Sequence, residues 1–326
     1  MEQSKNGILL HAQGLRKYFP VRRGFLQRVA GWVKAVDGVD FEIAKGKTLG
    51  LVGESGCGKS TIGRLILKLL EPDEGSILYK GRDIGGLTQS ELKPLRKEMQ
   101  IIFQDPSGSL NPRMTIGQSI EEGLRTLGVK DRGERRDRVC HLLETVGIAP
   151  EAADYYPHEF SGGQRQRIGI ARALSVEPTL IVCDEPVSAL DVSIQSQVLN
   201  LLKELQNRLG FSYLFISHDL NVVGYMSDRM AVMYLGHIME YAPADDLYDR
   251  YRHPYTQALF SAVPSPEPDH RREQAVLKGD VPSAFNPPPG CKFQGRCPLV
   301  EDRCRVGMIE MYPVNQEHTV RCWKVV

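Results

Sequence analysis

The sequence predicts an α/β fold that is built around a phosphate-binding loop. The first observation behind this prediction is the string GESGCGKST at residues 53 to 61. The second is the change of apolar pattern around it, because TLGLVG before the loop is a short apolar run typical of a buried parallel strand. After the loop, apolar residues recur at helical spacing, and Pro72 is expected to close that helix. The helical apolar positions are Ile62, Leu65, Ile66, Leu69 and Leu70.

The loop itself fits the pattern GxxxxGK[ST]. In this pattern backbone amides wrap the phosphates of a nucleotide, the lysine reaches the outer phosphates and the hydroxyl residue holds Mg²⁺. Lys59 and Ser60 stand at those two positions. The start of the following helix adds unpaired amides and the positive end of the helix dipole. We therefore predict that ATP is bound by Gly53, Ser55, Gly56, Cys57, Gly58, Lys59, Ser60 and Thr61.

A second glycine-containing string, FSGGQRQR, lies at residues 160 to 167. Ser161, Gly162 and Gly163 stand directly before the helical stretch QRQRIGIARAL, so their amides can form another anion site. One nucleotide cannot use both loops. Taken alone, the letters SGG more commonly indicate a glycine turn that caps an amphipathic helix.

A third string, LIVCDEP, lies at residues 180 to 186. Its apolar run predicts a buried strand that brings Asp184 and Glu185 to its carboxyl end, where the ligand sites of open α/β sheets lie. An acidic pair at such a place is equally typical of a helix cap or a surface pair. The residues alone leave both interpretations open.

The three strings, in this order, resemble the motifs of the ABC ATPases. The resemblance implies that Ser161, Gly162, Gly163 and Gln164 close over the γ-phosphate of a nucleotide held by a partner's phosphate loop. It also implies that Asp184 helps to hold Mg²⁺ and that Glu185 polarises the attacking water, for which a base must lie within hydrogen-bond distance of the proton it takes.

Four further residues match single-residue motifs of this family. Gln104 in IIFQDP matches the glutamine that contacts Mg²⁺, and His218 in LFISHD matches the histidine that contacts the γ-phosphate. Asp191 in SALD matches the loop that couples the two nucleotide sites of a pair. Tyr18 in LRKYFP is the candidate for stacking on adenine, with Phe19 or simple core packing of Tyr18 as alternatives.

Composition is that of an ordinary globular protein. The 326 residues are 41% hydrophobic and 25% charged, which is enough for one substantial core and a smaller annex. We see neither an apolar run of the roughly 20 residues that span a bilayer nor a signal-peptide pattern, so a cytoplasmic protein is expected. A net charge of +1 gives no overall field for nucleic acid or an anionic membrane. The basic stretch 14–34 is expected to be a solvated loop, with contact to lipid headgroups as the alternative.

Two domains are expected. Residues 1–240 hold every nucleotide motif and form the ATP-binding domain, with a helical insert at about 106–178 and a core helix near 196–209 that Gly210 stops. Val198, Leu202, Leu205 and Leu209 are expected to share one face of that helix. Residues 241–326 are rich in proline, which excludes long helices, and form an accessory domain.

The accessory domain holds four of the seven cysteines. Five, six and seventeen residues separate them, which is wider than the usual zinc spacing and unlike common ferredoxin spacings. The residues leave an iron–sulfur cluster, an irregular zinc site and free thiols open, whereas a cytoplasmic location disfavours disulfides. The cysteines are Cys291, Cys297, Cys304 and Cys322.

Longer strings resemble one branch of the ABC family, the importers of peptides and nickel, and most closely the F-type ATPases of dipeptide importers. The strings are QDPSGSLNPRMTIGQSI, PHEFSGGQRQR, PVSALDVSIQSQVLNLL and HPYTQAL. The resemblance implies that the four cysteines bind a [4Fe-4S] cluster and that the fold carries an antiparallel β edge.

The same resemblance implies a machine at the cytoplasmic face of the inner membrane. Two membrane permeases, a second and paralogous ATPase and an external binding protein are the expected partners, and nucleic acid is not. Alternatives are a soluble ABC ATPase outside transport, an iron–sulfur protein that also binds ATP, and an importer ATPase for nickel or glutathione.

Overall fold

The computed structural model describes residues 7–25, 27–262 and 282–326, which form two compact units. The first unit takes in the described residues up to 44, then 48–85 and everything described from 217 onward. The second unit consists of 45–47 and 86–216. Part of the proline-rich tail, residues 263–281, lies outside the described residues. The domain boundary near residue 240 stays a prediction.

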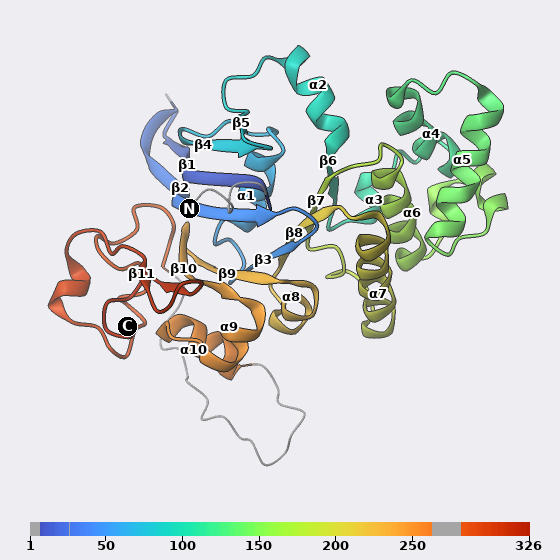
Figure 1. The fold of residues 1–326 in the computed structure, drawn as a ribbon. Coiled ribbons are helices and arrows are strands. Elements are labelled where there is room, and N and C mark those ends of the chain that lie inside the picture. The colour runs from blue at the N-terminus through green and yellow to red at the C-terminus, as the bar shows by residue number, and fades with distance from the viewer. Residues whose placement is uncertain (1–6, 26, 263–281) are drawn as a thin grey trace. The chain divides into compact units, whose positions relative to one another are not determined.

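An antiparallel sheet begins the first unit, in the strand order β2-β1-β4-β5 (Figure 1). Its strands β1 and β2 form a long hairpin, so the expectation of a solvated loop at 14–34 was wrong. Two acids that compensate this basic stretch lie far along the sequence, since Lys17 Nζ donates to Asp73 Oδ1 at 2.8 Å and Arg16 pairs with Glu74. A third, Asp37, is close in sequence and lies 3.6 Å from Lys34 Nζ. The strands are β1 (Ile8–Arg23), β2 (Arg28–Ala44), β4 (Glu74–Tyr79) and β5 (Arg82–Asp83).

A second sheet of this unit has the order β11-β12-β10-β9-β3. Strand β3 runs parallel to β9 and is buried at every residue, as its apolar sequence predicts. The strands are β3 (Thr48–Val52), β9 (Arg229–Tyr234), β10 (His237–Pro243), β11 (Tyr312–Pro313) and β12 (Thr319–Val320). The helices of the unit are α1 (Lys59–Ile66), α8 (Leu220–Met226), α9 (Ala244–Arg250), α10 (Pro254–Ser261) and the 3-10 turn η4 (Asp302–Arg305).

Helix α1 ends at Ile66, well before the proline that was expected to close it. Lys68 adopts the left-handed conformation at φ 53°, and the amides of Leu69 and Leu70 turn back to the carbonyl oxygen of Arg64. Leu69, which its spacing placed in the helix, therefore lies beyond it and is 54% exposed. The ammonium of Lys68 stabilises this turn by donating to Glu71 and to the carbonyl oxygen of Gly85.

The second unit has parallel strands in the order β8-β7-β6 and a group of helices (Figure 1). The strands are β6 (Met99–Ile102), β7 (Leu180–Asp184) and β8 (Ser212–Ser217). Between β6 and β7 the chain forms α3 (Pro106–Ser109), α4 (Ile116–Leu127), α5 (Arg132–Thr145), η2 (Pro150–Asp154), η3 (Pro157–Glu159) and α6 (Gly162–Leu174). Helix α2 (Gln89–Glu98) precedes β6, and α7 (Val192–Leu209) follows β7.

Helix α7 contains the predicted stretch and ends where it was expected to end. Gly210 follows it in the left-handed conformation, at φ 74°, and caps it. Val198, Leu202 and Leu205 are buried, but Leu209 in the last turn is 53% exposed. All four residues lie in α7 at the spacing of one helix face, and the core covers this face except at Leu209.

Each helix that the structure describes is too short or too polar to cross a lipid bilayer.

Candidate nucleotide-binding and hydrolysis site

The phosphate loop lies between β3 and α1 and depends on glycine at fixed points. Gly58 has φ 112°, and a Cβ there would lie 2.0 Å from the carbonyl oxygen of Ala35. A larger residue at this position is excluded both by its backbone conformation and by space. Because Gly58 also stands at the N-cap of α1 and has no side chain, the first amides of the helix carry no side-chain cap. An anion would find donors there.

Lys59 is buried and its ammonium folds back onto the loop. Its Nζ donates to the carbonyl oxygens of Gly53 at 2.7 Å and Glu54 at 3.1 Å. The lysine is thus held beside the loop by two neutral carbonyl acceptors. When a nucleotide binds, a charged phosphate oxygen would replace these carbonyl oxygens as the acceptor. Cys57 is also buried, and burial raises the pKa of its thiol, which fits a structural residue in the loop.

Glu54, which the motif leaves unspecified, makes the contacts that the sequence did not reveal. Its carboxylate accepts hydrogen bonds from both terminal nitrogens of Arg296, and its amide donates to the hydroxyl of Tyr255 at 3.0 Å. Both partners come from the C-terminal part of the chain. No local pattern pairs residues 242 positions apart, so this contact required the structure.

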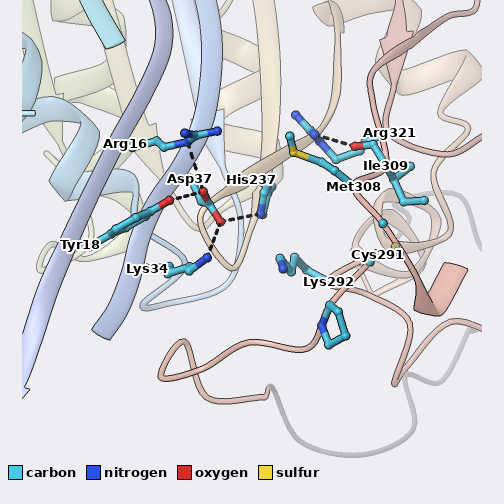
Figure 2. A pocket seen from close by; sticks show the side chains of 13 residues that line it. Arg16, Tyr18, Lys34, Asp37, His237, Cys291, Lys292, Met308, Ile309 and Arg321 are labelled. Carbon is cyan, nitrogen blue, oxygen red and sulfur yellow. Dashed lines mark hydrogen bonds and ion pairs between the residues drawn. The ribbon is translucent and has the colours of Figure 1, made fainter. Parts of the chain in front are cut away.

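Tyr18, the candidate adenine-stacking residue, lines a cavity of about 430 Å³ (Figure 2). Its hydroxyl donates to Asp37 Oδ1 at 2.5 Å, and Lys34 Nζ lies 5.3 Å from the centre of its ring. His237 Nε2 lies 3.5 Å from Asp37 Oδ2. The neighbouring His237 ring and the hydrogen bond from Tyr18 hold the pKa of the Asp37 carboxyl well below its usual range, whereas burial lowers the pKa of His237.

Asp37 therefore stays ionised and fixes the orientation of the Tyr18 ring, which a stacking platform needs. His218, the other candidate in the first unit, is exposed in the connection between β8 and α8. The next residue, Asp219, caps α8 by accepting hydrogen bonds from the amides of Asn221 and Val222.

In the second unit, Glu185 follows β7 with a backbone that few non-glycine residues adopt. Its φ is 50°, and its amide donates to the carbonyl oxygen of Ile216 at 2.9 Å. Gln104 Nε2 donates to Glu185 Oε2 at 3.1 Å, so two predicted residues 81 positions apart in the sequence come together. Strained conformations of this kind concentrate at functional sites. Asp184, which directly precedes Glu185, is the last residue of β7 and is half-buried.

The second glycine-containing string opens α6 and has a helix-capping role. Ser161 Oγ accepts from the amide of Gln164 at 3.3 Å, and Gln164 Oε1 accepts from the amide of Ser161 at 2.9 Å. A Cβ at Gly163 would lie 2.4 Å from Ile194 Cγ2, so close packing also requires glycine there. Asp191 is exposed at the N-cap of α7. The side chains that were predicted to contact a partner's nucleotide are thus engaged in the cap of α6.

The four tail cysteines are unpaired and influence one another electrostatically. Burial raises the pKa of Cys291 to about 11, and the thiols of the other three add to that rise. The amide of Cys291 donates to the carbonyl oxygen of Cys304 at 2.8 Å. Among the residues that the structure describes, however, no three His, Cys, Asp or Glu side chains are arranged as a metal site. Four thiols are the right kind and number of ligands for an iron–sulfur cluster, but the described arrangement of these side chains does not form a metal site.

Comparison with known proteins decides the family. Residues 36–188 match the model of the family described as ABC transporter, and residues 239–304 match the model of the oligopeptide/dipeptide transporter C-terminal region. The chain is 52% identical over 325 residues to the oligopeptide transport ATP-binding protein AppF of Bacillus subtilis, covering 99% of each chain. The chain belongs to the ABC transporter family, as an ATP-binding subunit of its peptide-import branch.

Two further comparisons agree with this family. Identity is 49% over 333 residues to the oligopeptide transport ATP-binding protein OppF of Salmonella typhimurium, covering 100% of this chain and 98% of the relative. A solved dimer of the ATP-binding cassette MJ0796, in a post-hydrolysis state with ADP and Pi, aligns with a TM-score of 0.64 and 28% identity over 72% of this chain and 98% of its own. The predicted ABC ATPase fold and ATPase activity are therefore confirmed, and the soluble alternative outside transport is not favoured.

Proposed function

We propose that this ABC ATPase lies at the cytoplasmic face of the inner membrane and powers the uptake of short peptides into the cell. The proposal extends to a paralogous second ATPase, two permeases and an external binding protein, with dipeptides as the leading cargo ahead of longer peptides, nickel chelates and glutathione. Relatives at about half identity over nearly the whole chain are named for oligopeptide transport, which supports a peptide cargo.

The contact between Gln104 and Glu185 is the observation that carries the hydrolytic assignment. The amide nitrogen of Gln104 orients the carboxylate of Glu185, and the left-handed backbone of Glu185 fixes where that carboxylate points. A carboxylate held in this way can accept a proton from an attacking water as the bond to the γ-phosphate breaks. We assign Glu185 as the general base and His218 as a residue that contacts the γ-phosphate.

The remaining nucleotide roles follow the family motifs. We propose that the phosphate-loop residues bind the phosphates, with Lys59 exchanging its two carbonyl contacts for phosphate oxygens, and that Tyr18 stacks on adenine. Ser60, Gln104 and Asp184 supply the oxygen ligands that Mg²⁺ prefers. The ion, when bound, neutralises charge that develops on the phosphates. Ser161, Gly162, Gly163 and Gln164 serve the nucleotide of the second ATPase, and Asp191 couples the two sites.

A [4Fe-4S] cluster on the four tail cysteines is also proposed, from the sequence resemblance, and no step of hydrolysis is routed through it. Such a cluster would cross-link a proline-rich tail that is too small to build a core of its own. Iron and acid-labile sulfide would be measured on protein purified without oxygen. About four of each per chain is the expected result, and zinc alone would refute the cluster.

The transport assignment is tested by capture from native membranes. Tagged Glu185→Gln protein would be isolated after ATP treatment, because arrested hydrolysis keeps the assembly closed, and its partners would be identified by mass spectrometry. Two permeases and a second ATPase are expected. Recovery of ribosomal or DNA-repair proteins without any permease would overturn the transport role and leave the ATPase intact.

A further inference from the structure

The phosphate loop carries a carboxylate that is held by the C-terminal tail. Arg296 Nη1 lies 3.1 Å from Glu54 Oε1 and 2.9 Å from Oε2, and its Nη2 lies 3.1 Å from Oε1. The side chain of Arg296 is 8% exposed and that of Glu54 is 24% exposed. A paired geometry of this kind is stronger and more directional than a surface ion pair.

The same tail fixes the backbone of Glu54. Tyr255, the tyrosine of the HPYTQAL string, accepts a hydrogen bond from the Glu54 amide at 3.0 Å. Its ring packs against Tyr234 at 4.6 Å and Phe293 at 5.4 Å between ring centres, and Arg296 lies 5.9 Å from the centre of the Tyr234 ring. The guanidinium is therefore placed by an aromatic cluster.

Two tail segments produce this cluster. His253 at the start of α10 accepts a hydrogen bond from the Tyr255 amide through Nδ1 at 3.0 Å, and its own amide donates to Glu240 at 3.0 Å. The amide of Arg296 donates to the carbonyl oxygen of Phe293 at 3.0 Å, which closes a turn between the first two tail cysteines. Two tail residues, Tyr255 and Arg296, thus contact one residue of the phosphate loop, Glu54.

The charge of Glu54 explains why such contacts matter. Its carbonyl oxygen lies 3.1 Å from the Lys59 ammonium, so its carboxylate belongs to the loop that receives phosphates. A free carboxylate there would repel a nucleotide that carries several negative charges, whereas a paired one would not. We propose that Arg296 is a positioning residue for nucleotide binding, which neutralises Glu54 and holds it away from the phosphates.

This inference rests on the proposed role of the phosphate loop and goes beyond it, because it gives the tail a part in ATP affinity. The ligand whose binding Arg296 supports is a nucleoside triphosphate. It acts through Glu54 and does not itself contact the ligand. Its effect should therefore disappear when the charge of Glu54 is removed.

The test is a double-mutant cycle on the full-length chain, with ATP affinity measured by displacement of a fluorescent ATP analogue. Arg296→Met keeps an unbranched side chain under the aromatic cluster and removes the charge. We expect it to weaken ATP binding about fivefold to tenfold. Glu54→Gln alone should change affinity less than about twofold, and the double variant should return to within about twofold of the parent.

Three controls make the outcome decisive. Arg303→Met removes another tail arginine, which stacks on Trp323 at 4.8 Å, and should leave ATP affinity unchanged. If Arg296→Met fails to fold, Arg296→Gln, which also removes the charge, gives the same comparison with and without Glu54→Gln. An unchanged affinity, or a double variant as weak as the arginine variant alone, would overturn the proposal. Lys59→Ala is measured in parallel, because parent-like binding by that variant would refute the nucleotide site itself.

Discussion

Glu54 and Glu185 are two acids that follow buried strands in nucleotide motifs, and their surroundings differ. Glu54 stands two residues after β3 and is gripped by the guanidinium of Arg296. Glu185 stands directly after β7, accepts a hydrogen bond from the neutral amide of Gln104 and has a left-handed backbone. Both carboxylate oxygens of Glu54 accept hydrogen bonds from the guanidinium, so position after a strand does not by itself make an acid catalytic. Its partner and its backbone do.

Removing the charge of Glu185 should have the largest effect. We expect Glu185→Gln to lower steady-state ATP hydrolysis about 10²- to 10⁴-fold, because a general base is lost, while ATP affinity stays within about twofold. A phosphate-release assay and an equilibrium binding assay measure the two quantities. Undiminished turnover would refute the catalytic role and make the two acids equivalent.

Removing the ammonium of Lys59 should affect binding more than chemistry. Lys59→Ala is expected to weaken ATP affinity about 10- to 100-fold, because a charge-assisted contact with the phosphates is lost. Titration with a fluorescent ATP analogue measures this change. Affinity equal to that of the parent would mean that the nucleotide lies elsewhere.

His253 should make the stability of the folded chain sensitive to pH. Burial lowers the pKa of His253 to about 3, so the folded chain keeps it neutral while the unfolded chain protonates it below its ordinary value of 6.5. Stability should therefore fall as the pH drops from about 6.5 toward 3, by about 2 kcal/mol near pH 5.

The comparison variant is His253→Asn, whose side chain can still accept a hydrogen bond from the backbone N–H of Tyr255 but does not titrate. The free energy of unfolding in urea would be measured near pH 7.5 and near pH 5. We expect the parent to lose about 2 kcal/mol more than the variant over this interval. Equal losses would show that His253 titrates normally in the folded chain.

Removing the charge of Glu54 should have the smallest effect. Glu54→Gln keeps the backbone N–H that donates a hydrogen bond to the Tyr255 hydroxyl. We therefore expect ATP turnover within about twofold of the parent. Turnover that falls as far as in Glu185→Gln would erase the distinction between the two acids.

Local chemistry explains what could be predicted. The phosphate loop, β3, β7 and the glycine stop of α7 depend on short-range rules of backbone conformation and apolar spacing, and the sequence carries those rules directly. The pairing of Gln104 with Glu185 was within reach because both residues end or follow strands that the motifs already marked.

Distant contacts explain what could not be predicted. Helix α1 ends early because the Lys68 ammonium finds partners in Glu71 and Gly85, and the basic hairpin is compensated by Asp73 and Glu74. The pairing of Glu54 with Arg296 depends on how the tail folds back. The four cysteines gave a donor set without a local geometry, so their ligand remains a proposal.

If ATP hydrolysis by this chain powers peptide import, peptide uptake by cells should depend on Glu185. Cells that lack the chain would be complemented with the parent, Glu185→Gln or Glu54→Gln, and uptake of a radiolabelled dipeptide would be followed. The parent and Glu54→Gln are expected to restore uptake, and Glu185→Gln is not. Uptake restored by Glu185→Gln as well as by the parent would contradict this expectation.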